Sequence, residues 1–272
     1  MVKAREKFWL FGVRPHQDDA LMNGLKYPGQ RHGSRITPAE GAFMLDVPNM
    51  IMVCADGVPA PFSDDAKQYC ESFRRCKNVF WSASGSNGYR TGNEEAFICR
   101  LAEMFPNVSG VFLDDFLGEL DTEEKRKKAE NTLKEIRRGL SRSPRPLPIY
   151  AVCYAALLVK KYCRVFDYID GLTLWTWDSN ELPLLEKRYR RFERLFPKHK
   201  KMLGIYLYDF LNRTPVPVER MKLQCELGLS LLREKRVDGL IFESNSVMGV
   251  GMPSEAWLYE WLQTAADVEV PE

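Results

Sequence analysis

Eight short apolar runs recur along the chain, and each is followed by a loop and a segment of helical periodicity. They are rich in Val, Ile, Leu, Phe, Tyr and Trp and lie at 8–13, 50–55, 79–83, 110–115, 148–153, 171–177, 203–210 and 239–244. Their apolar character is continuous rather than alternating, which is typical of parallel strands covered on both faces. The pattern predicts that residues 1–272 form a single domain, a (β/α)8 TIM barrel.

Helical segments separate the apolar runs. They are expected at 64–75, 93–104, 121–140, 156–166, 184–196, 218–233 and 254–265, and a further helix starts at Thr37, which is predicted to form a capping box with Glu40. The main alternative is an open, doubly wound sheet, in which a glycine-rich phosphate loop would follow the first strand. The sequence there reads RPHQDD, which favours the barrel.

The composition is that of an ordinary globular protein and makes several classes of function improbable. Lys and Arg number 39 against 37 Asp and Glu, a net charge of +2, so no nucleic-acid or membrane partner is expected. No run of 18 apolar residues suggests a transmembrane helix. The seven cysteines are odd in number and lack CxxC spacing, which predicts a reducing, cytoplasmic location. A secretion signal trimmed from the natural chain is the alternative.

The stretch VSGVFLDDF, residues 108–116, is the clearest candidate for a functional site. An apolar run of strand formers ends there in two adjacent carboxylates, Asp114 and Asp115. Burying either charge unpaired is expensive, so this strand is expected to open into a polar cleft. Alternation along the strand predicts that only one of the two points into the barrel mouth. We expect Asp114 to be that reacting group and Asp115 to brace a loop.

Acids and aromatic residues gather at the C-terminal ends of the predicted strands, where barrels of this kind carry their active sites. Splitting a glycosidic bond needs one carboxylic acid to protonate the leaving oxygen and a second carboxylate to attack or to activate water. Aromatic rings offer flat faces to sugar rings. The predicted catalytic residues are Asp114, Glu243 and Asp178, and the predicted substrate-binding residues are His16, Asp19, Asp115, Tyr154, Trp175, Trp177, Tyr208 and Asp209.

Several of these residues have an alternative structural role. Asp178 is equally suited to cap the turn in WDSNELP, and Asp209 to hold the loop at 212–213. Trp175 and Trp177 are two residues apart and share one face of their strand. They form either the wall of a pocket or part of the barrel core. Glu243 ends a short and otherwise buried strand, which favours a role in the site.

With LDDF, LWTWDS, YLYDF and FES at its strand ends, the chain resembles the TIM-barrel glycoside hydrolases. The resemblance covers almost the whole chain as architecture, but only these four motifs carry it. The clan with an Asn-Glu acid on strand four and a Glu nucleophile on strand seven does not match, and the chitinase-like DxxDxDxE signature is absent. Families with an Asp nucleophile after strand four and an Asp acid after strand six match better, through Asp114 or Asp115 with Asp178. The resemblance implies an oligosaccharide or glycoside substrate and no cofactor.

Two other functions stay open at this point. One is a non-catalytic sugar-binding barrel that keeps the pocket of such an enzyme. The other is a lyase or aldolase barrel that binds a divalent metal through Asp56, Asp114, Asp178 and Glu243. The stretch PHQDD at 15–19 is similar to the zinc motif of the N-acetylglucosamine deacetylases, but that motif needs a further histidine, and the remaining ones are His32 and His199. No metal site is predicted.

Overall fold

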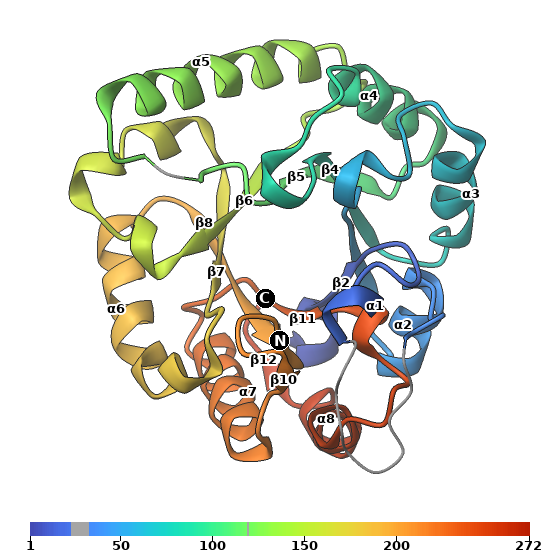
Figure 1. Ribbon diagram of the computed structural model, residues 1–272, viewed down its shortest axis with the longest axis vertical. Helices are drawn as coiled ribbons and strands as arrows, with labels where there is room; N and C mark the ends of the chain where they lie inside the picture. The colour runs from blue at the N-terminus through green and yellow to red at the C-terminus, as the bar shows by residue number, and fades with distance from the viewer. Residues whose placement is uncertain (23–32, 119) are drawn as a thin grey trace.

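Eight parallel strands close into a barrel in the computed structural model, which describes residues 1–22, 33–118 and 120–272 (Figure 1). Each strand pairs with the next one along the chain, and the last pairs back with the first. This confirms the predicted (β/α)8 TIM barrel. The strands are β2 (Phe8–Gly12), β3 (Asn49–Met52), β4 (Asn78–Ser84), β5 (Val108–Leu113), β6 (Ile149–Tyr154), β7 (Gly171–Trp175), β8 (Lys200–Tyr206) and β11 (Gly239–Glu243).

Helices form the outer ring of the barrel (Figure 1). They are α2 (Pro38–Leu45), α3 (Asp64–Ser72), α4 (Glu94–Met104), α5 (Glu123–Leu140), α6 (Leu185–Leu195), α7 (Val218–Arg233) and α8 (Pro253–Ala265), and the short α1 (Asp19–Met22) follows β2. The predicted capping box is present, because Thr37 accepts from the Glu40 amide while Glu40 accepts from the Thr37 amide. Among the described residues, no helix has the length and apolar character needed to cross a bilayer.

Two predicted elements differ from the structure. The segment 156–166 is not an α-helix but a series of short 3-10 turns, η4 (Ala155–Leu157), η5 (Lys160–Tyr162) and η6 (Val165–Tyr168). Val159 adopts an extended conformation that interrupts it, which suits a β-branched residue. The run 203–210 is also not one strand: β8 ends at Tyr206, and β9 (Tyr208–Asp209) turns away to pair with β10 (Thr214–Pro215).

Both ends of the described chain meet in a small antiparallel pair. The strand β1 (Val2–Lys3) lies against β12 (Glu269–Val270), with Val2 opposite Val270. Because β1 directly precedes β2, this pair belongs to the end of the barrel where the strands begin. The opposite end, where the strands finish, carries the loops that form the cavity described below.

Large rings and glycines fill the barrel interior together. Side chains alternate between interior and exterior along each strand. On β2, β4 and β6 the rings of Trp9, Phe80 and Tyr150 pack against one another, with centroids 4.5 Å apart for the first pair and 4.9 Å for the second. Gly204 leaves room for Trp175 on the adjacent strand, because a Cβ at Gly204 would lie 2.0 Å from the indole ring. Glycine is therefore required there to seat the tryptophan that lines the cavity.

Replacing Gly204 with alanine is expected to destabilise the barrel. The added methyl group overlaps the Trp175 ring, and such overpacking costs about 1–3 kcal/mol. Chemical denaturation monitored by tryptophan fluorescence measures the change in the free energy of unfolding. Gly118→Ala is the matched control, because nothing lies within 4 Å of a Cβ there, and it should change stability by less than about 0.5 kcal/mol. Equal stabilities of the two variants would contradict the packing argument.

Candidate active site

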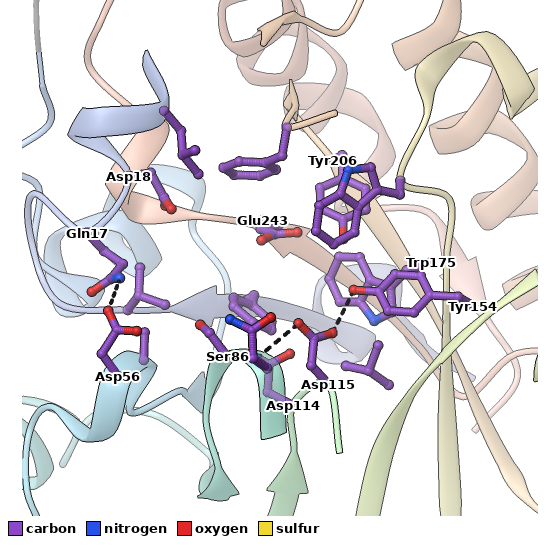
Figure 2. A pocket seen from close by; sticks show the side chains of 18 residues that line it. Gln17, Asp18, Asp56, Ser86, Asp114, Asp115, Tyr154, Trp175, Tyr206 and Glu243 are labelled. Atoms are coloured by element: carbon purple, nitrogen blue, oxygen red, sulfur yellow. Dashed lines mark hydrogen bonds between the residues drawn. The ribbon is translucent and has the colours of Figure 1, made fainter. Parts of the chain in front are cut away.

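A cavity of about 350 Å³ opens where the barrel strands end (Figure 2). That volume is in the range of small-molecule sites in proteins. Its lining comes from all eight barrel strands or the loops that follow them, so it lies at the C-terminal face that TIM-barrel enzymes use. The lining residues are Phe11, Val13, Gln17, Asp18, Leu21, Ala55, Asp56, Ser86, Asn87, Asp114, Asp115, Val152, Tyr154, Trp175, Trp177, Tyr206, Phe210 and Glu243.

Carboxyl groups dominate the polar part of this lining. Five acids contribute to it: Asp18, Asp56, Asp114, Asp115 and Glu243. No Lys, Arg or His belongs to the described lining. The most exposed acid, Asp56, is 3.7 Å from the Arg14 guanidinium and accepts a hydrogen bond from Gln17. The deeper acids have no such cation beside them, so the cavity concentrates negative charge whenever they ionise.

Aromatic side chains form the walls. Tyr206 packs against Trp175 at a centroid distance of 5.0 Å, and Tyr154 meets Trp177 edge to face at 5.8 Å. Trp175 is 2% exposed, whereas Trp177 is 43% exposed at the rim. Both tryptophans line the cavity, so of the two roles weighed for them the wall of the pocket is the one their placement fits.

Asp114 and Asp115 both line the cavity, which corrects the expectation that only one points inward. The strand ends at Leu113, and Asp115 has a left-handed backbone (φ 44°), so strand alternation no longer applies to it. Asp115 also braces a loop as predicted, because its carboxylate accepts from the Tyr154 hydroxyl at 3.0 Å and from the Asn87 amide at 3.4 Å.

Asp114 occupies a more enclosed position than its neighbour. It is 7% exposed, and its backbone is held against β4, where its amide donates to the Ser84 carbonyl and its carbonyl accepts from the Ser84 hydroxyl. Burial, and next the charge of Asp115, raise the pKa of Asp114 well above its usual range. Two adjacent carboxyls in one site resist being ionised together, so this pair retains a proton more readily than either acid alone.

Glu243 ends β11 at the centre of the cavity, between Asp18 and Tyr206 (Figure 2). It is partly open to the cavity and otherwise enclosed by protein. Burial raises the pKa of Glu243 well above its usual range, and the charges of Asp18, Asp114 and Asp115 raise it further. A hydrogen bond with the Tyr206 hydroxyl lowers this pKa in part. Glu243 is thus a carboxyl that keeps its proton to higher pH than usual, and it borders the cavity.

Tyr206 and Tyr154 lie beside the carboxyls of the site. The Tyr206 hydroxyl lies near enough to Glu243 to influence its pKa, and the Tyr154 hydroxyl donates a hydrogen bond to Asp115 at 3.0 Å. Burial, and then the neighbouring acids, raise the pKa of both phenols well above the usual value, so both stay protonated. Each phenol therefore offers a hydroxyl group to one carboxyl of the site.

The loop after β11 positions the third buried acid, Asp18. Asn245 is fully buried and clamps the end of β2, because its amide group bonds both the Val13 amide and the Val13 carbonyl at 2.9 Å. The adjacent Ser246 hydroxyl donates to Asp18. Burial raises the pKa of Asp18, the Ser246 hydrogen bond lowers it in part, and the charges of Asp19 and Asp56 raise it.

Two acids predicted for the site serve neighbouring loops instead. Asp178 lies outside the lining, where it caps η7 (Ser179–Leu184) by accepting from the Asn180 amide and also accepts from the Asn212 side chain. Asp209 is fully buried and accepts from the amides of Ser179 and Asn212. Burial raises the pKa of Asp209, but these hydrogen bonds outweigh it and the pKa is lowered. Both match the structural alternatives considered for them.

Three further predicted binding residues also lie outside the described lining. His16 pairs with Asp19 at 2.8 Å, and Asp19 accepts from the Ser34 amide, so both shape the loop after β2. Tyr208 is fully buried, and its hydroxyl donates to the Leu21 carbonyl. It was expected in the cavity because 203–210 reads as one strand, whereas β8 ends two residues earlier, at Tyr206.

Tyr206 and Asp18 are two polar lining residues that the predicted catalytic and substrate-binding sets did not include. The signal for Tyr206 was available, because Met202, Gly204 and Tyr206 follow the same alternation that brings Glu243 inward on β11. Asp18 carried no comparable signal, since its place depends on Ser246, which is distant in sequence.

No cluster of three or more His, Cys, Asp or Glu within the described ranges has the arrangement to hold a metal ion. The oxygen-ligand set considered from the sequence is therefore not assembled, because Asp178 caps a turn away from Asp114 and Glu243. His32, the other histidine weighed for a zinc site, lies outside the described residues.

Comparisons with known proteins show what the fold resembles. No family model and no curated protein sequence matches the chain. Similar solved structures include PbGH5A, a glycoside hydrolase family 5 enzyme from Prevotella bryantii B14, with 12% identity, 97% of this chain and 98% of that chain covered, and a TM-score of 0.59. The GH99 endo-alpha-mannosidase from Bacteroides thetaiotaomicron has 9% identity, 95% of each chain covered and a TM-score of 0.58.

An aldolase, QR15, is also similar, with 10% identity, 97% of this chain and 100% of that chain covered, and a TM-score of 0.52. Several further matches are glycoside hydrolases, so the expected resemblance to that group of TIM barrels is confirmed for the architecture. At these identities the likeness shows the fold alone, and the chemistry has to be argued from the cavity.

Replacing Glu243 with glutamine is expected to stabilise the fold at neutral pH. Folding raises the pKa of Glu243, so its contribution to stability falls as the pH rises above the unfolded value near ~4. Removing the ionisable group should raise the free energy of unfolding by about 1–3 kcal/mol at pH 7.5, and the gain should shrink toward pH 4. Urea denaturation at both pH values measures it.

Glu234→Gln is the control for this measurement. Glu234 is exposed, and a hydrogen bond from Arg236 lowers its pKa, so removing its charge should give no gain at pH 7.5. A gain for Glu243→Gln that is equal at both pH values would show that the cost of ionising Glu243 is not its source.

Proposed function

We propose that this protein is a carbohydrate-active enzyme, a glycoside hydrolase in which Glu243 is the general acid and the Asp114–Asp115 pair supplies the opposing carboxylate. The observation that carries the proposal is the enclosure of Glu243 and this pair in one aromatic-walled cavity at the C-terminal face of the barrel. Glycosidases need a carboxyl that is protonated at the working pH together with one that is ionised.

Glu243 fits the acid because it keeps its proton and is still accessible. Burial and the surrounding acids raise its pKa, and a carboxyl with a raised pKa can protonate a leaving group near neutral pH. Asp114 has a raised pKa as well but is more enclosed, at 7% exposed. Glu243 therefore donates to the glycosidic oxygen more readily than Asp114 does.

Asp115 fits the opposing carboxylate. The Tyr154 hydroxyl and the Asn87 amide both donate to it, so two donors hold this carboxyl in position at the cavity. Asp114 beside it is the member of the pair whose pKa burial raises. This assignment reverses the roles expected from the sequence, since the left-handed backbone brings Asp115 into the cavity.

Glu243 gives its proton to the glycosidic oxygen as the bond from that oxygen to the anomeric carbon breaks. If Asp115 attacks the anomeric carbon, a glycosyl ester forms; water then cleaves that ester, and ionised Glu243 takes the proton of this water as Asp115 leaves as a carboxylate. If Asp115 instead takes a proton from a water that attacks the anomeric carbon, the sugar is released in the same step. Asp115 then gives its proton to solvent and Glu243 takes one from solvent, which restores both groups.

The aromatic walls suit a sugar ring in this position. Trp175, Tyr206 and Trp177 present flat faces and edges around the carboxyls, which can pack against the C–H faces of a pyranose. A Schiff-base aldolase, which differs from the metal-dependent alternative considered above, needs a lysine, and the described lining contains none.

Glu243→Gln is expected to lower kcat for alkyl glycosides by about 10²–10⁴-fold, because the proton donor is lost. The loss should be much smaller for 2,4-dinitrophenyl glycosides, whose leaving group needs no proton. Asp115→Asn should lower kcat for both substrates by a similar factor, whereas Asp114→Asn should have the smaller effect. Steady-state kinetics against a panel of glycosides measures all three.

Glu255→Gln is the matched control for the activity assays. Glu255 is also a buried carboxyl with a raised pKa, but it lies outside the cavity lining and is bonded to Gly249 and Tyr259. Its activity should stay within about twofold of the parent. Sugar binding without turnover in the parent protein would instead identify a non-catalytic sugar-binding barrel.

Tyr206→Phe is expected to move the basic limb of the pH–rate profile upward. The Tyr206 hydrogen bond lowers the pKa of Glu243, so removing the hydroxyl raises that pKa and keeps the acid protonated to higher pH. The pH dependence of kcat/KM for an alkyl glycoside reports the change. A basic limb that stays in place would assign the acid to a group other than Glu243.

A further inference from the structure

Three cavities meet at Asp115. The central one, of about 350 Å³, adjoins a second of about 310 Å³ and a third of about 360 Å³, and Asn87 and Asp115 line all three. Tyr154 is shared by the central and second cavities, and Leu117 and Gly118 by the second and third. The lining therefore continues from the barrel centre past the residues after β5 and β6 to residues of α5.

The second cavity has mainly apolar walls. Its apolar lining residues are Leu117 after β5, Val152 on β6, and Ala156 and Leu157 in the turn after β6. Each cavity alone is in the range of a small-ligand site, which starts at about 300 Å³. The three together hold much more than the single sugar unit that the central carboxyls would act upon.

The charges of the central cavity favour an uncharged sugar. Its described lining has five acids and no basic residue, so an anionic unit would meet repulsion there. Three cations line the third cavity: Arg90, Lys125 and Lys128. Two of them are engaged within the protein, because Arg90 donates to Glu95 and to the Ala83 carbonyl and Lys125 pairs with Asp121.

We propose that the three cavities form one groove that binds a neutral oligosaccharide or polysaccharide, with one unit over the central carboxyls and further units along Leu117, Gly118 and Ala156. The proposal rests on the proposed function and deepens it, because it identifies the substrate as a chain rather than a single glycoside. Contacts with the outer units then contribute binding energy that raises kcat/KM for longer substrates.

Two substitutions can narrow the groove from different segments of its lining. Gly118, after β5, is exposed and has nothing within 4 Å of a Cβ, so Gly118→Leu projects into open space. Ala156, in the turn after β6, is also exposed, so Ala156→Leu adds bulk from a second segment. The matched control is Ala256→Leu, the same exchange at an exposed alanine on α8 outside the three cavities.

The experiment compares neutral oligosaccharide ladders of two to six units from the cello, malto, xylo and manno series. In the parent protein, kcat/KM for the preferred ladder should rise at least about tenfold from the disaccharide to the tetrasaccharide. Gly118→Leu and Ala156→Leu should each reduce this ratio toward one, whereas Ala256→Leu should keep it. Circular dichroism confirms that each variant is folded, and either groove variant suffices for the comparison.

The outcomes separate this proposal from the proposed function. Two results overturn the groove but leave the proposed hydrolase activity standing. One is turnover of aryl glycosides with no increase of kcat/KM with chain length. The other is an increase that both groove variants retain. If no glycoside is turned over, the proposal of a hydrolase fails. The groove is then tested by calorimetry, as the ratio of the affinities for the tetrasaccharide and the disaccharide of each series. Binding of none of the ladders overturns the groove as well.

Discussion

Closure of the barrel is the constraint on which the site depends, because it fixes which residue of each strand faces inward at the mouth. On β5, β7, β8 and β11 the inward series begins with small or apolar residues and finishes with Asp114, Trp175, Tyr206 and Glu243. Gly204 allows one of these rings to be seated, since a side chain there would displace Trp175. The same interior that stabilises the fold thus brings these carboxyl and aromatic groups into one cavity.

The acids of the cavity lower the stability of the fold, because their charged forms are unfavourable there. Asp18, Asp114 and Glu243 all lose hydration, and their charges raise one another's pKa values. An interior chosen for stability alone would replace such groups with apolar side chains. Their neighbours also differ in kind: hydroxyl and amide donors reach Asp115, whereas Asp114 lies deeper against β4. Two adjacent acids with different surroundings can hold different protonation states, which acid–base chemistry requires.

The barrel and part of the site could be predicted because continuous apolar runs and their terminal acids are local signals. Asp114, Glu243, Tyr154 and the two tryptophans follow from them. Asp178 and Asp209 present the same local signal, and only the loop amides of Asn180, Ser179 and Asn212 distinguish a capping acid from a cavity acid. The left-handed turn at Asp115 and the early end of β8 depend on packing between distant segments, so the sequence alone could not reveal them.

Tyr206 has a consequence for how the carboxyls communicate. A phenol carries one hydrogen, so Tyr206 can donate to Glu243 or to Tyr154 but not to both at once. When Glu243 is ionised it attracts that hydrogen, and Tyr154 then loses a donor while it still donates to Asp115. The direction in which the Tyr206 hydroxyl points therefore follows the charge of Glu243. A carboxyl at the end of β11 thereby influences the surroundings of a phenol on β6.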